Sequence, residues 1–522
     1  MKIADRFCSR TYLTQIRDPK VLVGVAILGA LTIGVRVLGL DYARGLPLHW
    51  DEPYVMRVVS KLVRESPTPV SFWSYPPALA NIIAWVAKGV GRADSPSSVV
   101  RVAHCVVVSL GVASALLSGF ATTLLRGYRA GLFTLWIAAL SPLWVEQTRY
   151  VTTDVPTAFG TALVVCVYCR ISITPRIREL MLAGAAVGIA AAFKYIGALS
   201  AVLVVAAVIV SPGARSRRVW LGLIAGGAVA IITFVGLNYQ ILSAFPLVLK
   251  ALKGEFGHYA TVHPGYSPPH VWLYVLKYVA LYGLGVAGTA CALYAFAVNA
   301  GHRRDLRLLP ILMLAVLWLG FLCTRRVFFA RNIVHVLPVL AVLAGVGFDA
   351  IWITWGKRGR AMALIAALLT LPMTGQTLQF GWALRETDSR IRASQWMASH
   401  LASTDRVAVS PPTPRFFLPI PQSKEIHLSP VGGYKAAKEL SGHYDYLVVP
   451  FGGITRYLRE PDAYRVEVRN FTRWHKALTR LAGPPVAAFD GAKAPGAELP
   501  GSTGDCYHNP RIEIYDLRRG RH

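Results

Sequence analysis

Long apolar segments separated by short polar connections fill the first three quarters of the chain. A helix needs roughly 17 to 25 mostly apolar residues to cross a bilayer, so each run near that length is a candidate span. The pattern predicts about eleven transmembrane helices, at residues 20–40, 99–125, 130–146, 155–173, 179–194, 196–212, 219–237, 271–299, 308–324, 333–354 and 361–376. The expected fold class is therefore an all-α polytopic membrane protein, followed by a smaller domain of different character.

The segment YPPALANIIAWVAKGV, residues 75–90, is apolar but short, and it contains Asn81 and Lys88. We interpret it as a helix lying in the membrane interface. Counting it as a span would move every later basic cluster to the opposite side of the membrane.

The composition agrees with a membrane protein. Of the 522 residues, 54% are hydrophobic and only 16% are charged, whereas soluble enzymes carry about a quarter charged residues. The net charge of +28 would suit a nucleic-acid-binding protein if the basic residues gathered on one soluble face. They lie instead in short clusters between apolar runs, so no nucleic-acid partner is expected.

The basic clusters fall at every second connection, which indicates the orientation of the chain. They lie near residues 2–20, 126–129, 170–178, 214–218, 302–307 and 356–360. Taking that side as cytoplasmic predicts a multi-pass plasma-membrane protein with a cytoplasmic N-terminus. The intervening connections, and everything after the last span, are then extracytoplasmic.

The first outer connection, residues 41–98, contains Asp51 and Glu52 in the stretch HWDEP. In the next residues, PYVMRVVSKLVRE, helical spacing places the apolar residues on one face and the basic residues on the other, which is typical of a helix on a membrane surface. Two interpretations of the carboxylates stay open. Asp51 is either the N-cap of this helix, with Glu52 in its first turn, or the pair is catalytic.

The second outer connection contains Glu146, Arg149 and Asp154 in SPLWVEQTRYVTTDVPTAF. An ionisable residue at the mouth of a span must face water or protein, so Asp154 is expected to open toward a cavity. The alternative is again an N-cap, for the helix that begins at Val155.

Basic residues also lie on the predicted outer side, against the usual trend. Lys194 interrupts the apolar stretch AAFKYIGAL, and the connection TRRVFFARNIVHVLP contributes Arg325, Arg326 and Arg331. Lys194 can simply extend toward the interface. An anionic ligand would explain the whole set.

Metal and redox signals are weak. Glu255, His258 and His263 have a spacing that a metal could use, but no further ligand cluster follows, so solvated loop residues are the favoured interpretation. We expect no cofactor; a divalent metal stays open as an alternative, but no residue pattern supports it. Six of the seven cysteines precede the tail, which excludes a disulfide framework there.

The tail, residues 377–522, changes character and predicts a small α/β domain outside the membrane. SRIRASQWMASHL indicates an amphipathic helix, while RVAVS, YDYLVVPF, RVEVRNF and RIEIYDL indicate strands. The predicted boundaries are 1–376 for the membrane domain and 377–522 for the tail domain, which either touches an acceptor or supports packing.

Several motifs resemble one known family. HWDE, SYPPAL, TRYVTTDVP, FKYIG, RNIVHVLPVLAVLAG and DSRIRASQWMASHL look, in this order and between about residues 20 and 400, like the bacterial and archaeal relatives of the dolichyl-phosphate-mannose protein mannosyltransferases. These belong to the GT-C class of glycosyltransferases that use lipid-linked sugars. The related aminoarabinose transferases for lipid A have a Glu-Lys pair before the double proline, where this chain has Ser74 and Tyr75. That departure argues against a lipid A acceptor.

The resemblance implies an inverting, mannosyltransferase-like enzyme that moves a sugar from a polyprenyl phosphate to a hydroxyl of an extracytoplasmic acceptor. It places Asp51, with Glu52 beside it, and Asp154 at the catalytic centre, and it assigns Lys194 to the donor phosphate. Arg149 and Arg331 are further candidates for stabilising the leaving phosphate.

A different class stays open, namely a multi-pass transporter or flippase of a lipid-linked or small anionic substrate. Transporters usually place ionisable residues near the bilayer midplane and often show repeated halves. Here the acidic residues gather at one mouth. A scaffold protein, the third possibility, would leave Asp51 and Asp154 only a capping role.

Overall fold

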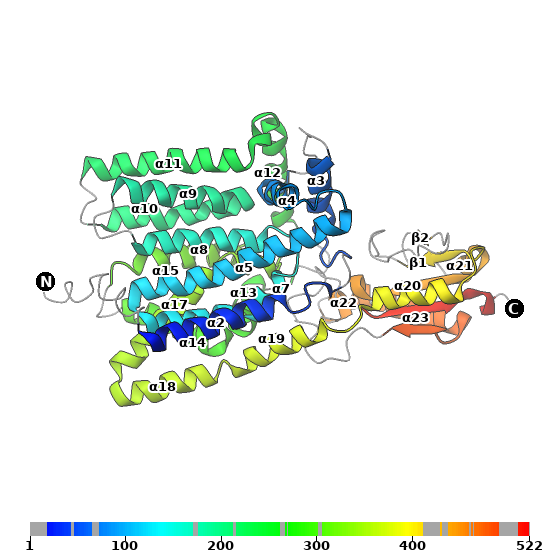
Figure 1. The fold of residues 1–522 in the computed structure, drawn as a ribbon. Helices are drawn as coiled ribbons and strands as arrows, with labels where there is room; N and C mark the ends of the chain where they lie inside the picture. The colour runs from blue at the N-terminus through cyan, green and yellow to red at the C-terminus, as the bar shows by residue number, and fades with distance from the viewer. Residues whose placement is uncertain are drawn as a thin grey trace. The chain divides into compact units, whose positions relative to one another are not determined.

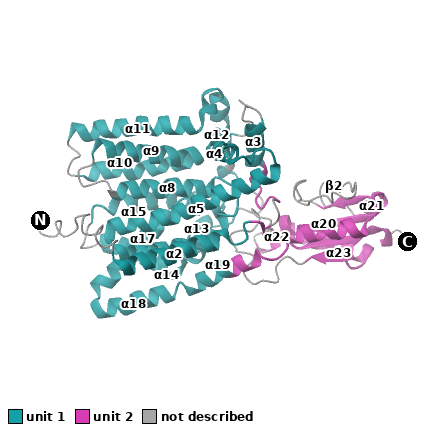
Figure 2. Ribbon diagram, in the orientation of Figure 1, with its two compact units in different colours: residues 1–40, 54–378 teal, residues 41–53, 379–522 magenta. Residues whose placement is uncertain are grey.

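The computed structural model of the chain describes residues 18–42, 46–64, 73–170, 176–211, 216–261, 267–268, 270–300, 305–410, 428–430, 437–458, 461–462, 464–489 and 510–520. Within these ranges the protein is mostly helical, with one small sheet (Figure 1). The residues divide into two compact units, 1–40 with 54–378 and 41–53 with 379–522 (Figure 2). The short segment 41–53, part of the first outer connection, thus packs with the second unit.

The first unit consists of helices, many of them long and roughly parallel (Figure 1). They are α2 (Pro19–Val37), α3 (Glu52–Arg64), α4 (Ala78–Gly89), α5 (Pro96–Arg126), α6 (Tyr128–Leu140), α7 (Pro142–Gln147), α8 (Asp154–Arg170), α9 (Ile177–Phe193), η3 (Tyr195–Ser200), α10 (Ala201–Val210), α11 (Arg217–Leu237), η5 (Tyr239–Leu242), α12 (Phe245–Ala260), α13 (Val271–Tyr278), η6 (Val279–Gly283), α14 (Gly285–Ala300), α15 (Leu309–Cys323), α16 (Arg331–Val334), α17 (Leu337–Thr354), α18 (Gly356–Leu368) and α19 (Leu371–Ala383), the last of which crosses the unit boundary.

Among the described residues, five helices are long and apolar enough to cross a membrane, and α13 with α14 form a sixth candidate that bends by 113°. Five shorter apolar helices accompany them. The expected all-helical, multi-pass membrane fold with a small α/β domain is confirmed. Ten of the eleven predicted spans overlap these long, bent or shorter apolar helices, and the remaining one, 179–194, overlaps the 17-residue helix α9. The segment 75–90 contains α4, which Pro77 precedes.

Small residues allow the membrane helices to pack closely. A side chain added at Gly184 of α9 would overlap the carbonyl oxygen of Gly226 in α11, so these two backbones are in direct contact. Close contact through small residues is how helices associate where lipid removes the hydrophobic driving force. α8 packs against both α5 and α9, and its first residue, Asp154, is buried.

The amphipathic helix predicted after Asp51 is confirmed as α3. Val55, Val59 and Leu62 are buried on one face, whereas Arg57 and Lys61 are exposed on the other. The burial follows directly from the apolar positions at helical spacing.

The second unit contains a five-stranded sheet in the order β2-β1-β3-β5-β4. Its elements are β1 (Val407–Val409), β2 (Leu428–Pro430), β3 (Tyr446–Pro450), β4 (Ala487–Phe489), β5 (Ile512–Asp516), α20 (Ser389–His400), α21 (Ala437–His443), α22 (Gly452–Leu458), α23 (Arg465–Ala482) and η7 (Leu517–Gly520). β2, β1 and β3 are parallel, while β5 runs antiparallel to both β3 and β4.

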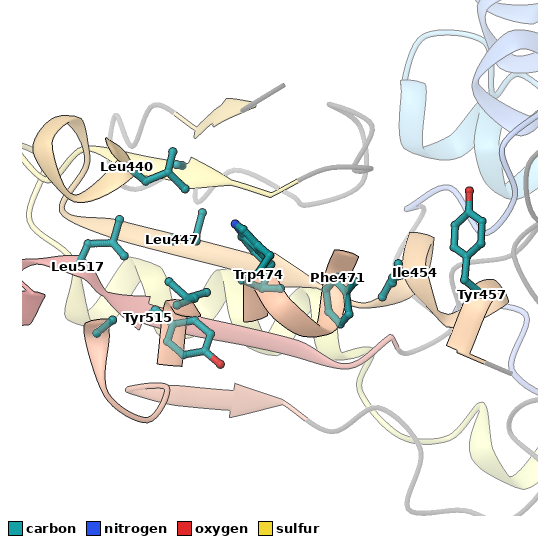
Figure 3. Packing of buried hydrophobic residues seen from close by; sticks show 12 residues of the cluster. Leu440, Leu447, Ile454, Tyr457, Phe471, Trp474, Tyr515 and Leu517 are labelled. Carbon is teal, nitrogen blue, oxygen red and sulfur yellow. The ribbon is translucent and has the colours of Figure 1, made fainter. Parts of the chain in front are cut away.

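Helices cover both faces of this sheet. Ala393, Met397 and Leu401 of α20 and its C-terminal end pack against one set of strand residues. On the other face, Phe471, Trp474 and Leu478 of α23 pack with Leu447 and Tyr515, among others (Figure 3).

One predicted strand of this domain is wrong. RVEVRNF, residues 465–471, forms the start of α23 rather than a strand. Its alternation of polar and apolar residues is only local, because apolar residues continue at Phe471, Trp474, Leu478 and Ala482 with helical spacing. The helix of 18 residues buries that stripe, which a strand of seven residues could not.

Candidate active site

Asp154 is the centre of a buried cluster of ionisable side chains in the first unit. Its Oδ1 atom lies 2.8 Å from Lys194 Nζ and 2.8 Å from His335 Nε2, and its Oδ2 atom lies 3.9 Å from Arg331 Nε. Asp154 is the first residue of α8 and is only 1% exposed. Its carboxylate therefore binds side chains of two other segments and does not merely cap its own helix.

Lys194 occupies a break in the helical structure. It ends α9 in an extended conformation, φ −153° and ψ 133°, before the η3 turn begins. This break places the side chain against Asp154 and Asn332, whose Oδ1 atom accepts a second hydrogen bond from Nζ at 3.1 Å. Nζ also lies 5.4 Å from the ring centroid of Tyr75, a distance typical of a cation–π contact.

A short segment between α15 and α17 supplies the remaining members of the cluster. Arg331 and Asn332 begin the one-turn helix α16, and His335 follows it, one helical turn after Arg331. Asn332 also accepts the Lys194 bond described above and donates to the hydroxyl of Tyr259 at 3.2 Å. Arg331 lies over the ring of Phe329, 4.3 Å from its centroid.

The pair Asp51 and Glu52 belongs to the segment packed with the second unit. α3 begins at Glu52, so Asp51 stands at its N-cap position. The Asp51 amide donates to His49 Nδ1 at 3.0 Å, and the Asp51 side chain keeps 18% exposure. Glu52 is buried, and its carboxylate accepts a hydrogen bond from the Leu48 amide.

These contacts indicate different roles for Glu52 and Asp51. Glu52 reaches back to the backbone four residues before it and so ties down the HWDE loop. Asp51, next to it, remains accessible to solvent. An accessible carboxylate held in a fixed loop is suited to accept a proton.

Arg149 has contacts away from the Asp154 cluster. Its Nη2 atom donates to the carbonyl oxygen of Val35 at 2.7 Å, in the last turn of α2. Arg36 similarly donates to the carbonyl oxygens of Ala138 and Ala139, near the end of α6. Both arginines thus stabilise helix C-termini. The Nε and Nη1 atoms of Arg149 are buried and have no acceptor among the described residues.

Glu146 of the same connection lies in α7 and is fully buried. The hydroxyl of Tyr150 donates to its Oε1 atom at 2.8 Å. Arg325 is half-buried and stacks on Phe321, and its contacts lie outside the cluster.

The described residues contain no group of three or more His, Cys, Asp or Glu side chains that could hold a metal ion. His263 and the side chain of His258 lie outside what the structure describes.

The structure thus brings together three of the residues singled out in the sequence, Asp154, Lys194 and Arg331. Sequence reasoning missed Asn332, His335 and Tyr259. His335 follows Arg331 by four residues inside RNIVHVLP, a spacing that puts both on one helical face. The four-residue spacing from Arg331 is therefore the sequence signal that could have identified His335. The sequence contains no comparable signal for Tyr259.

The comparisons with known proteins agree with this architecture. The family model described as dolichyl-phosphate-mannose-protein mannosyltransferase matches residues 75–238. This range includes Tyr75, Arg149, Asp154 and Lys194. No curated protein sequence matches the chain significantly.

Solved structures with the same fold cover almost the whole chain. ArnT from Cupriavidus metallidurans bound to undecaprenyl phosphate aligns with a TM-score of 0.55 at 15% identity, over 94% of this chain and 98% of its own. The oligosaccharyltransferase AglB from Archaeoglobus fulgidus, in complex with an inhibitory peptide and a dolichol-phosphate, aligns with a TM-score of 0.56 at 13% identity, over 85% of this chain and 71% of its own. The chain therefore has the fold of the GT-C glycosyltransferases ArnT and AglB. The match of the family model to residues 75–238 confirms its resemblance to the dolichyl-phosphate-mannose protein mannosyltransferases.

Proposed function

We propose that this protein is an inverting glycosyltransferase that moves a sugar from a polyprenyl-phosphate donor to a hydroxyl of an acceptor at the extracytoplasmic face of the membrane. The fold supports this proposal, because two proteins that share it were solved with undecaprenyl phosphate and with a dolichol-phosphate. The family match over residues 75–238 makes mannose the first sugar to test.

The unused hydrogen-bonding capacity of Lys194 is the observation on which the proposal mainly rests. An ammonium group has three N–H donors, and Lys194 spends two of them on Asp154 and Asn332. The third has no hydrogen-bond acceptor among the described residues. The side chain keeps 10% exposure, so it is not fully sealed from its surroundings. A phosphate oxygen of the donor would complete its hydrogen bonds.

Burial of this cluster in a membrane protein also points to function. Ionisable groups within membrane-spanning regions are costly, and they usually mark substrate paths or reaction sites. Asp154 holds Lys194 and His335 in place through its Oδ1 atom, so we assign it as a positioning residue for the donor site. Arg331 is a further donor-phosphate candidate. Arg149 is another, because its Nε and Nη1 atoms find no acceptor in the part of the chain that the structure describes.

Asp51 is assigned as the general base of the transfer. The acceptor oxygen attacks the anomeric carbon, its proton passes to the Asp51 carboxylate, and the bond from that carbon to the phosphate oxygen breaks. The electron pair leaves with the polyprenyl phosphate, whose negative charge Lys194 stabilises. One displacement inverts the anomeric centre and needs no covalent intermediate. Glu52 keeps Asp51 in place through the Leu48 amide.

A transporter or flippase is the second candidate, because α13 and α14 meet at a bend of 113°. Interrupted helices of this kind form binding sites in many secondary transporters. A transporter would move a lipid-linked sugar or a small anion without breaking a covalent bond.

A transfer assay separates the two functions. Membranes or nanodiscs with the full chain are supplied with a panel of polyprenyl-phosphate sugars labelled in the sugar, with mannose first. The enzyme releases unsugared polyprenyl phosphate and forms a labelled acceptor. Movement of intact donor between leaflets, with no polyprenyl phosphate released from any sugar in the panel, would instead establish the transporter.

A further inference from the structure

The second unit carries a line of basic side chains along one helix. Arg465, Arg469, Arg473, Lys476 and Arg480 of α23 are all exposed. Their spacing of three or four residues places them within less than a quarter turn of the helix circumference. From the first to the last is about 22 Å of helix. We call these five residues the α23 basic stripe.

The opposite face of α23 is fixed in the domain core. Phe471, Trp474, Leu478 and Ala482 are buried with residues of β3 and β5 (Figure 3). The helix is therefore held by its apolar side, and its basic side points away from the domain core. This arrangement is the reverse of a membrane-inserting amphipathic helix, whose apolar face enters the lipid.

Charge compensation on the α23 basic stripe is nearly absent. Arg465 lies 3.3 Å from Asp462, and both side chains are largely exposed. Among the described residues, no carboxylate lies within ion-pair distance of the other four members. A row of four uncompensated cations attracts a polyanionic surface.

We propose that the α23 basic stripe binds the anionic phospholipid headgroups of the bilayer that holds the first unit. The short connection between the two units favours phospholipid headgroups as the ligand. α19 ends at Ala383 and α20 begins at Ser389, so a connection of five residues ties the second unit to the last apolar helix. A surface tethered so closely meets the headgroups at a high effective concentration.

The expected interaction is electrostatic only. Basic clusters beside a membrane are attracted to anionic lipid within about one Debye length, which is roughly 10 Å at 0.1 M salt and shorter at higher salt. Because the apolar face is occupied, binding adds no insertion of side chains into the acyl region. High salt must therefore release the α23 basic stripe, and a neutral bilayer must not hold it.

The native lysines allow a direct test on the full chain. Lys476 lies in the stripe, and Lys438 of α21 is exposed elsewhere in the same domain. The protein is placed in nanodiscs of phosphatidylcholine alone or with about a third phosphatidylglycerol. Modification of both lysines by a membrane-impermeant amine reagent is followed by mass spectrometry at low and high salt. Arg469→Gln/Arg473→Gln weakens the stripe, and Arg406→Gln/Arg519→Gln removes the same charge from other exposed sites.

The proposal expects Lys476 to react several-fold more slowly in the anionic nanodiscs at low salt, with Lys438 unchanged. High salt and Arg469→Gln/Arg473→Gln abolish this protection, whereas Arg406→Gln/Arg519→Gln keeps it. Equal reactivity of Lys476 in both nanodiscs, equal slowing of both lysines, or protection that survives Arg469→Gln/Arg473→Gln would overturn it. Protection by soluble dextran sulfate but not by phosphatidylglycerol would assign the stripe to an anionic glycan instead.

Discussion

Lys194 and Asp154 form an ion pair of 2.8 Å in which the two residues are only 8% and 1% exposed. The lysine comes from a break at the end of α9 and the aspartate from the first residue of α8. Breaking such a pair leaves an uncompensated charge in a poorly hydrated place, which is strongly destabilising. The ion pair is therefore expected to contribute to the stability of the folded protein as well as to the proposed reaction.

We expect Lys194→Met to destabilise the protein by about 3 kcal/mol, because Asp154 loses its closest cation. The double variant Asp154→Asn/Lys194→Met should recover at least about 1 kcal/mol of this loss, since no charge is left unpaired by the lysine's removal. Thermal unfolding of the purified proteins in one detergent measures both changes. The exposed Lys88→Met serves as control and should change little. Additive losses in the double variant would show that the two side chains are not coupled.

Asp51→Asn should lower turnover on the order of a hundredfold or more while leaving thermal stability near wild type. Asparagine preserves size and caps a helix almost as well as aspartate, so only proton transfer is lost. Initial rates of sugar transfer measure the change in turnover, and thermal unfolding measures the change in stability. If Asp51 were only the N-cap of α3, Asn would be tolerated and Ala would cost roughly 1 kcal/mol. Near-normal transfer by Asp51→Asn would therefore remove the residue from the chemistry.

Much of the fold was predictable from the sequence, because apolar length and helical spacing are local properties. The spans and α3 followed from them. The start of α23 was wrongly predicted as a strand because polar and apolar residues alternate over the seven residues 465–471. The helical spacing of apolar residues becomes visible only over the full length of the helix. The contacts of Lys194 were not predictable, since Asp154 lies 40 residues away in the chain and Asn332 lies 138. Only the packing of α8, α9 and α16 brings these residues together.

Acid should destabilise the second unit through Glu513 of β5. Burial raises the pKa of this carboxyl group, but hydrogen bonds from His475, Tyr515 and Arg511 outweigh burial and lower the pKa to about 2, from an ordinary value of 4.5. A depressed pKa contributes stability that is complete above about pH 5 and is lost as the pH falls toward 2. Hydrogen exchange of the β3 and β5 amides between pH 6 and pH 3, corrected for intrinsic rates, measures this loss.

Two variants serve as controls for this pH dependence. Glu513→Gln should flatten the loss of protection between pH 5 and pH 3, because the titrating group is gone. Glu467→Gln on α23 should leave the wild-type profile unchanged. An identical acid profile in wild type and Glu513→Gln would contradict the assignment.

The predicted orientation of the chain can be tested by cysteine labelling. In a chain whose seven native cysteines are replaced, a membrane-impermeant maleimide added to intact cells should label Glu255→Cys and Ala477→Cys. Ser216→Cys and Arg358→Cys should react only after permeabilisation, because they lie in basic clusters that mark the cytoplasmic side. Labelling of Ala477→Cys only after permeabilisation would put the second unit in the cytoplasm and reverse the predicted topology.

The release of polyprenyl phosphate by the purified full chain tests the proposed function most directly. Nanodiscs with wild type, Lys194→Ala, Lys194→Arg or Lys88→Ala receive a polyprenyl-phosphate sugar and acceptor membranes, and the lipid product is quantified by mass spectrometry. We predict release by wild type and Lys88→Ala, a loss of at least about tenfold for Lys194→Ala, and partial activity for Lys194→Arg, which keeps the charge but changes the geometry. Equal release by wild type and Lys194→Ala, under conditions where donor is limiting, would contradict the assignment of Lys194 to the donor phosphate.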